Sequence, residues 1–231
     1  HLCNHIVNLN NIDYFLIPDD LKKFQNETLD CLNIFKNKRL SSKKFRHIKA
    51  NNLIITDHPV VVSGNASRDI MNIPAWISKW LKDQFLKNLD SKKNIAQKRI
   101  YIDRTITNKA ETEQRSIENE NDVKELLLRK NFVSVKLHEK TFKEQVEIFN
   151  NAEFIIGLHG GGFANLAFCK PGTKIIELKN LTSGNPIKNL SEKNQLNYNS
   201  ISVQSKQLYK FKNPNQQGSI NIDINHLEKM L

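Results

Sequence analysis

The sequence predicts an α/β protein whose C-terminal half forms a doubly wound parallel sheet. From Arg99 onward, short apolar runs alternate with segments of helical periodicity, which is the order expected of βαβ units. The apolar run at residues 154–158 is continuous and is followed by a histidine and a glycine triplet, as expected for a strand buried on both faces. A short helical segment, a Pro-Gly turn and a second apolar run at residues 174–178 complete this unit.

The chain has 231 residues, which is long enough for one large domain or two small ones. Within residues 1–72 we expect the last part of an α/β domain whose beginning is missing, since the chain starts at His1 rather than at methionine. We predict a strand at residues 12–17 and a helix that starts at the two aspartates at 19–20. A second strand is expected at residues 53–56.

A polar stretch at residues 63–72 is expected to loop between two domains. Pro74 can occupy the first turn of a helix, and apolar side chains follow it at helical spacing. They are Trp76, Ile77, Trp80, Leu81 and Phe85. We interpret this stripe as core packing. The chain then divides into a partial domain at residues 1–72, a linking helix and linker at 73–98, and a larger α/β domain at 99–231.

The larger domain is expected to alternate strands and helices. The predicted strands cover residues 99–103, 132–137, 154–158, 174–178 and 198–203. The predicted helices cover residues 121–130, 141–149 with Thr141 as the N-cap, and 224–231. Val123, Leu126 and Leu127 are expected to face inward from the first of these helices. The polar segment at residues 105–118 is expected to be a loop over the functional face, and residues 181–196 an irregular stretch.

The chain is strongly basic, with a formal net charge of +11. Seven lysines and arginines and no acid lie between Lys36 and Lys49. A solvated loop is the simplest interpretation, and a patch that steers the protein to an anionic membrane or acceptor is the alternative. An RNA-associated protein ranks last, because the basic residues are not interleaved with aromatic residues and no RNP-type motif is present. We therefore expect no nucleic-acid partner.

Cysteine usage and hydropathy indicate a cytoplasmic protein. The three cysteines are far apart and form no C-x-x-C pair, so we expect reduced thiols in the core rather than disulfides or a zinc site. No apolar run approaches the roughly 18 residues that a membrane-spanning helix needs, and no signal peptide is recognised. Peripheral attachment to the inner membrane through basic residues remains a hypothesis.

The glycine triplet after the strand at residues 154–158 is the strongest candidate site. His159 stands at the carboxyl end of that strand, where open α/β sheets bind ligands. Gly160, Gly161 and Gly162 allow a ligand to approach the backbone, and the helix start that follows can seat a phosphate. A turn that needs glycine only for packing is one alternative. The His-Gly-Gly-Gly loop of lipases is another, but no G-x-S-x-G nucleophile motif occurs in this sequence.

The longer pattern resembles a known family. Residues 159–178 read His-Gly-Gly-Gly-Phe-Ala-Asn-Leu-Ala-Phe-Cys-Lys-Pro-Gly-Thr-Lys-Ile-Ile-Glu-Leu. This segment resembles the signature of glycosyltransferase family 61, which usually begins His-Gly-Ala-Gly-Leu-Ala-Asn-Leu. The chain departs from it with Gly161 for alanine and Phe163 for leucine. The resemblance extends over residues 98–180, through a Tyr-x-x-Arg strand end, an Arg followed by Asn-Glu, and a Phe-x-x-Gln helix. These are Tyr101 and Arg104, Arg115 with Asn119 and Glu120, and Phe142 and Gln145.

The resemblance implies a GT-B fold, with two Rossmann-like domains facing each other across a cleft. It further implies transfer of a sugar from a nucleoside-diphosphate donor, preferably a UDP-sugar, to a hydroxyl of a glycan or lipid-linked acceptor. Inversion at the anomeric carbon, surface or capsule polysaccharide synthesis and independence of metals are expected. No cofactor is expected, and no Asp-x-Asp metal motif occurs in the sequence.

The candidate residues can be given roles on this basis. Arg104, His159 and Glu177 fall at or near the carboxyl ends of three predicted strands, as expected of a nucleotide site. Arg104 and Arg115 are expected to hold the diphosphate, together with the amides of the glycine loop. Glu177 is expected to accept hydrogen bonds from ribose or sugar hydroxyls. The resemblance adds Asn119 and Asn165 to the donor site.

The catalytic base is the least determined role. His159 is the first choice and Glu120 the second, while an acid in the missing N-terminal part is a third option. A non-catalytic module that binds a nucleotide or sugar nucleotide is the alternative function. Such a module would retain Arg104 and the glycine loop but would not turn over a substrate.

Overall fold

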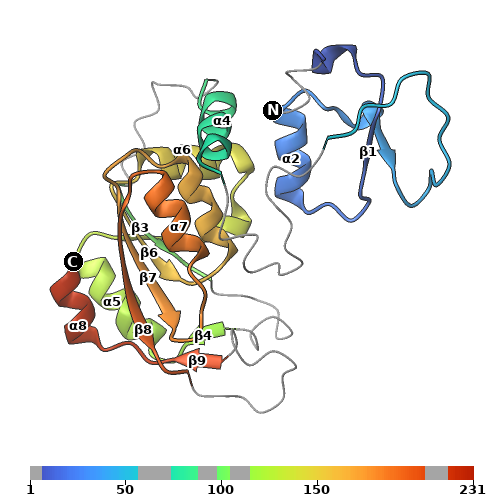
Figure 1. Cartoon of the computed structure of the whole chain (residues 1–231). Helices are drawn as coiled ribbons and strands as arrows, with labels where there is room; N and C mark the ends of the chain where they lie inside the picture. The colour runs from blue at the N-terminus through green and yellow to red at the C-terminus, as the bar shows by residue number, and fades with distance from the viewer. Residues whose placement is uncertain (1–6, 57–73, 88–97, 105–114, 206–217) are drawn as a thin grey trace.

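The computed structural model describes residues 7–56, 74–87, 98–104, 115–205 and 218–231. Its centre is a five-stranded sheet in which every neighbouring pair of strands is parallel (Figure 1). The order is β5-β3-β6-β7-β8. The strands are β3 (Arg99–Ile102), β5 (Val133–Val135), β6 (Phe154–Leu158), β7 (Lys174–Asn180) and β8 (Asn197–Val203). The predicted α/β class and parallel sheet are therefore confirmed.

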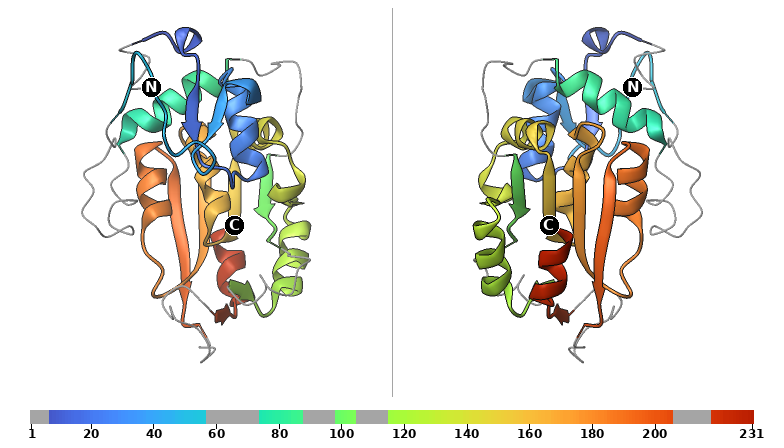
Figure 2. Two further views of the ribbon diagram at one scale, coloured as in Figure 1. Left: turned by 90° about the vertical axis from the view of Figure 1, so that its right-hand side faces the viewer. Right: turned by 90° about the vertical axis from the view of Figure 1, so that its left-hand side faces the viewer.

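Helices cover both faces of the sheet (Figures 1 and 2). One face carries α4 (Ala75–Phe85), α6 (Phe142–Asn151), α7 (Pro186–Lys193) and the 3-10 helix η4 (Gly161–Phe168). The other carries α5 (Glu120–Arg129) and α8 (Ile224–Met230). In β6, Ile155 packs into the first core and Ile156 into the second. Burial on both faces explains why β6 is an unbroken apolar run.

The predicted core packing of the α4 stripe is confirmed in part. Phe85 lies in the first core and Leu81 packs against it, whereas Trp76, Ile77 and Trp80 are half-buried. The ring of Phe85 lies 4.9 Å from that of Phe142 and 6.1 Å from that of Phe168, in edge-to-face geometry. Such pairs are favourable beyond the area that they bury. The Ser78 hydroxyl on the same helix accepts a hydrogen bond of 3.2 Å from the Asn194 side chain. Helix α4 is therefore held by the core of the sheet.

The N-terminal part pairs β1 (Phe15–Ile17) in parallel with β2 (Arg39–Ser41), and α2 (Lys23–Cys31) connects them. The predicted second strand at residues 53–56 is wrong, because no strand forms there and β2 lies inside the basic run. Arg39 explains this placement. Its guanidinium is buried and donates to Asp30 Oδ1 at 2.6 Å and to the Ile34 carbonyl at 2.7 Å.

The predicted start of the N-terminal helix at the two aspartates is also wrong. Helix α2 begins at Lys23, after the N-cap Lys22, whose amide donates to Gln25 Oε1 at 2.8 Å. Asp19 instead accepts hydrogen bonds from the Ser41 hydroxyl at 2.6 Å and the Lys43 amide at 3.2 Å. The carboxylate therefore closes the end of the β1–β2 pair rather than a helix.

Two polar segments that were expected to be irregular contain regular structure. Residues 115–117 of the predicted loop form β4 (Arg115–Ile117), which pairs in parallel with β9 (Gly218–Ile220). Residues 186–193 form α7, with Pro186 at its first position. Strand β4 is short and depends on its pairing with β9. Helix α7 turns Ile187 and Leu190 toward the first core, and their spacing after Pro186 is a helical pattern that the sequence interpretation overlooked. The expected loop at 63–72, residues 88–97 of the expected linker and residues 105–114 of the expected loop over the functional face lie outside the described residues.

Several expected elements are confirmed. Helix α5 buries Val123, Leu126 and Leu127, and Thr141 forms a capping box with Glu144 at the start of α6. Hydrogen bonds from Thr141 hold the pKa of the Glu144 carboxyl below its usual range. The helix expected after the glycines begins inside the triplet instead, at Gly161, and is a 3-10 helix. The other 3-10 helices of the described residues are η1 (Leu9–Asn11), η2 (Lys36–Lys38) and η3 (Leu137–Glu139). Among the described residues, no helix is both long and apolar enough to cross a membrane.

Candidate functional site

The order of the strands reverses between β3 and β6. Counted along the chain, the sheet has the order 2-1-3-4-5, so the crossovers on the two sides of this pair run in opposite directions. Ligands of open α/β sheets bind outside the carboxyl ends of the strands at such a point. Ile102 is paired with Gly157, which brings the following residues Arg104 and His159 together. The Arg104 Nη1 atom donates to the His159 carbonyl at 3.0 Å.

A second arginine reaches the same carbonyl. Arg115, at the start of β4, donates from Nη1 to the His159 oxygen at 3.2 Å. Burial lowers the pKa of both guanidinium groups, and the charge of Arg104 lowers that of Arg115 further. Both nevertheless remain cations at neutral pH. Two positive charges are therefore held together against one backbone oxygen.

One nitrogen of this pair is not satisfied. Within the part of the chain that the structure describes, the buried Nε atom of Arg115 has no hydrogen-bond partner. A buried donor without an acceptor costs about 1–3 kcal/mol. A phosphate oxygen between the two guanidinium groups would satisfy this donor and reduce the repulsion between the charges.

The three glycines have different surroundings. A Cβ atom on Gly160 would lie 2.8 Å from Arg104 Nη1, whereas one on Gly161 would meet no atom within 4 Å. A Cβ atom on Gly162 would lie 3.0 Å from Leu137 and 3.2 Å from Ile102. A side chain at position 160 would therefore displace the end of Arg104, and one at position 162 would need Leu137 and Ile102 to shift slightly. The Phe163 amide donates to the Gly160 carbonyl at 3.1 Å. This amide of the loop therefore already has an acceptor within the protein and is not free to bind a phosphate oxygen.

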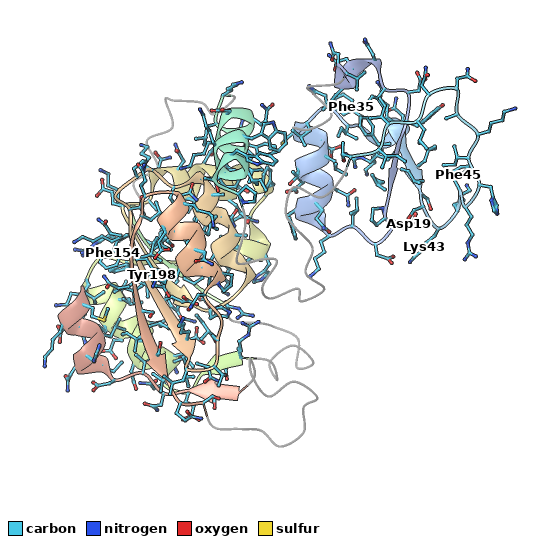
Figure 3. All side chains as sticks on the ribbon, viewed as in Figure 1. Asp19, Phe35, Lys43, Phe45, Phe154 and Tyr198 are labelled. Atoms are coloured by element: carbon cyan, nitrogen blue, oxygen red, sulfur yellow. The ribbon has the colours of Figure 1, made fainter. Side chains whose placement is uncertain are left out.

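His159 is oriented by a buried carboxylate. Its Nδ1 atom is hydrogen-bonded to Oε1 of Glu177, and the Tyr198 hydroxyl donates to Oε2 of the same residue. Tyr198 extends from β8 (Figure 3). Glu177 is fully buried and His159 is 5% exposed. We assign the neutral tautomer with hydrogen on Nδ1 from this network, which leaves the Nε2 lone pair free to accept a proton.

Glu177 was expected at or near the end of its strand, but it lies inside the strand. Strand β7 continues to Asn180, which is paired with Val203 of β8, so Glu177 sits inside the sheet. Both of its oxygens are engaged by protein groups. This geometry favours a role in orienting His159 over one in binding sugar hydroxyls.

Asn119 and Asn165 are engaged within the protein. The side chain of Asn119 donates to the Ile222 carbonyl at 2.8 Å and accepts from the Ile222 amide at 2.9 Å. Asn165 donates to Gln145 Oε1 at 3.0 Å and to the Gly162 carbonyl at 3.3 Å. Gln145 in turn donates to the Leu137 carbonyl at 3.0 Å. Through these hydrogen bonds, Asn165 and Gln145 connect the glycine loop to the segment that contains Leu137.

Glu120 belongs to a neighbouring polar network. Its Oε1 atom accepts a hydrogen bond of 2.9 Å from the Tyr101 hydroxyl and lies 3.3 Å from Lys124 Nζ. Lys124 also pairs with Asp103 at 3.0 Å. Burial, followed by the charge of Glu120, raises the pKa of Tyr101 far above its usual range. As a base, Glu120 would have to give up an ion pair, whereas His159 Nε2 has no such partner among the described residues.

The structure thus brings Arg104, Arg115, His159, Gly160 and Glu177 into one constellation. The sequence interpretation missed Tyr198 and Lys179. Lys179 shares a face of β7 with Glu177, as alternate residues of a strand do, and its Nζ atom lies 4.0 Å from Glu177 Oε2. Tyr198 is paired with Ile175, two residues before Glu177. Only the strand register, which the sequence does not provide, could have identified it.

The constellation suits an anion. It offers two guanidinium groups and an imidazole held by a carboxylate, all of which match phosphate and hydroxyl chemistry. In the portion of the chain covered by the structure, no group of three or more His, Cys, Asp or Glu side chains could hold a metal ion.

Comparison with known proteins gives one family. A family model described as Glycosyltransferase 61 matches residues 5–176. The matched region contains Arg104, Arg115 and the loop that begins at His159, and it ends one residue before Glu177. No curated protein gives a significant match to the chain.

Proposed function

The chain belongs to the glycosyltransferase 61 family, and we propose that its donor is a nucleoside-diphosphate sugar, with a UDP-sugar as the first candidate. Membership of this family implies a glycosyltransferase with a sugar donor and an acceptor. The observation that carries the proposal is the convergence of Arg104 and Arg115 on one carbonyl. Guanidinium groups bind phosphate oxygens in a planar, bidentate manner, and the unpaired Arg115 Nε atom supplies a further donor.

The proposed reaction inverts the anomeric carbon. Nε2 of His159 takes the proton of the acceptor hydroxyl, and the acceptor oxygen forms a bond to the anomeric carbon. The bond from that carbon to the diphosphate breaks, and the diphosphate leaves with the electron pair. Arg104 and Arg115 stabilise its growing negative charge, a task that a metal ion performs in other transferases. Glu120 is the second candidate for the base.

The architecture proposed for this reaction is of the GT-B type. Residues 99–231 would form the Rossmann-like donor domain, residues 73–98 the linking helix and linker, and residues 1–72 part of the acceptor-side domain. The parallel sheet with its reversal point supports the first assignment. The parallel β1–β2 pair, joined by α2, supports the last. A glycan or lipid-linked acceptor in surface or capsule polysaccharide synthesis completes the proposal.

A cytoplasmic location with peripheral contact to the inner membrane is proposed for the N-terminal part. Exposed basic side chains there alternate with exposed apolar ones. Phe45 is 40% exposed and Ile48 47% exposed, and both lie among Lys44, Arg46 and Lys49. Figure 3 shows Lys43 and Phe45 on the N-terminal part, away from the five-stranded sheet. This mixture is suited to an anionic lipid surface.

One observation favours the alternative of a non-catalytic sugar-nucleotide binding module. The His159 side chain is only 7% exposed, so an acceptor hydroxyl reaches Nε2 only at close approach. A binding module would keep the two arginines and have no need for that access.

Calorimetry with a panel of nucleoside diphosphates tests the donor site. We expect UDP to bind to the wild type with an affinity that EDTA does not change, and to bind at least tenfold more weakly to Arg104→Ala. Arg129→Ala is the matched control, because Arg129 is an exposed arginine that pairs with Glu125 on α5. If no nucleotide binds, the donor proposal is overturned. Binding of a UDP-sugar without release of UDP in the presence of glycan acceptors would favour the binding module.

A further inference from the structure

The carboxylate of Glu177 is held from three directions. His159 Nδ1 contacts Oε1 and the Tyr198 hydroxyl contacts Oε2, while Lys179 Nζ lies 4.0 Å from Oε2. These groups come from the loop after β6, from β8 and from β7. Glu177 itself is 0% exposed. A charge at such a position requires hydrogen bonds and a counter-charge, and these neighbours provide both.

The hydrogen-bond donor on β8, the hydroxyl of Tyr198, stays protonated. Burial raises the pKa of Tyr198 above its usual range, and the hydrogen bond to Glu177 and the charge of that residue raise it further. Tyr198 therefore keeps its proton wherever the protein is folded and donates it to Glu177. Lys179 is itself buried and donates to Asn185 Oδ1 at 3.3 Å, which fixes the ammonium group near the carboxylate.

We propose that Tyr198 and Lys179 are positioning residues that set the proton affinity of His159 through Glu177. The proposal rests on the assignment of His159 as the base. Neither residue contacts the transferred sugar in this proposal. Each withdraws negative charge from the Glu177 oxygens, and the remaining charge determines how strongly the carboxylate holds a proton on the imidazole.

The direction of the effect follows from the charges around His159. Glu177 favours the imidazolium form, while Arg104 and Arg115, which contact the His159 carbonyl, oppose it. Removal of the Tyr198 hydroxyl or of the Lys179 charge leaves the carboxylate less neutralised. The carboxylate at Nδ1 then stabilises the imidazolium form more strongly, and His159 gives up its Nε2 proton only at a higher pH.

The test is an NMR titration of the His159 ring in the ligand-free protein, with the resonance assigned by comparison with His159→Gln. In Tyr198→Phe and in Lys179→Met we expect the midpoint to rise by about 0.5–1 pH unit. Lys179→Arg keeps the charge and should return the midpoint toward that of the wild type. Tyr101→Phe is the matched control, because its hydroxyl serves Glu120 instead, and it should leave the His159 midpoint unchanged.

An unchanged His159 midpoint in both Tyr198→Phe and Lys179→Met, with native amide spectra, overturns the proposal. A pH profile of kcat/KM separates this failure from failure of the proposed function. If His159 is the base, the acid limb of the profile moves with the NMR midpoint. If the NMR midpoint moves and the limb does not, the coupling through Glu177 stands and the assignment of His159 as the base is wrong.

Discussion

The guanidinium group of Arg104 lies against the backbone of Gly160, where a Cβ atom would come within 2.8 Å of Nη1 and 3.2 Å of Cζ. The position of the arginine therefore depends on the absence of a side chain in the loop opposite. At the next position the situation is different, because a Cβ atom on Gly161 would meet nothing within 4 Å.

This contrast predicts different outcomes for two single-methyl changes. Gly160→Ala should displace Arg104 and weaken the binding of UDP by about 10–100-fold, since a hydrogen bond to a charged group contributes about 1.5–3 kcal/mol. Gly161→Ala, the matched control, should bind UDP as the wild type does. Calorimetry measures both. Equal affinities for the two variants would show that the guanidinium of Arg104 does not contact the diphosphate.

Asn119 provides a test between a structural role and a donor-binding role. Its side chain makes two hydrogen bonds to the backbone of Ile222. Asn119→Ala should lower the free energy of unfolding by about 1–3 kcal/mol and leave the affinity for UDP unchanged. Urea denaturation and calorimetry give the two quantities. A variant of normal stability with weak UDP binding would restore the expected place of Asn119 in the donor site.

The cysteines should differ in their reaction with iodoacetamide. Burial raises the pKa of Cys169 to about 12, so only roughly one part in ten thousand is thiolate at pH 8. The expected core position is wrong for Cys31, which is exposed. Its pKa is nevertheless raised, first by partial desolvation and then by the charges of Asp30 and Glu27. Cys31 should therefore be labelled slowly at pH 8 and faster as the pH rises to 9, while Cys169 should react only after denaturation. Peptide mass mapping distinguishes the sites, and labelling of native Cys169 would contradict its burial.

The N-terminal part should bind anionic vesicles. We expect co-sedimentation with phosphatidylglycerol vesicles and none with neutral phosphatidylcholine. Each basic residue near such a surface contributes about 1 kcal/mol, so replacing Lys44, Arg46 and Lys49 by glutamine should weaken binding by about 100-fold. Phe45→Ser with Ile48→Ser should also weaken it. The matched control replaces three exposed lysines of other elements, Lys143, Lys170 and Lys188, and an equal loss there would indicate attraction by net charge alone.

The sequence predicted the sheet well because its strands are buried on both faces. Strand β6 is a continuous apolar run and helix α5 carries apolar residues at helical spacing, and both form where expected. Strand β4 was missed because it is short and polar, whereas α7 was missed although Ile187 and Leu190 follow Pro186 at helical spacing. Strand β4 exists through its pairing with β9, which lies about a hundred residues later in the chain.

The candidate site was predicted in its composition more than in its roles. Arg104 and His159 meet because both follow strands that are neighbours at the reversal point. Glu177 was assigned to the sugar because a strand end was expected there, whereas β7 continues to Asn180. The partner of Glu177 on β8 depends on register between strands. Sequence periodicity identifies the faces of a strand but not its register.

The pairing of β4 with β9 has a consequence for biosynthesis. Arg115 is in register with Gly218, so the strand that carries it is complete only after residues 218–220 have left the ribosome. The central sheet and the loop at His159 are synthesised earlier. In a nascent chain, Arg104 would therefore reach its place beside His159 well before Arg115 does. Non-local strand pairing of this kind also forms slowly. Tight binding of a diphosphate would be delayed until the last part of this sequence has been translated.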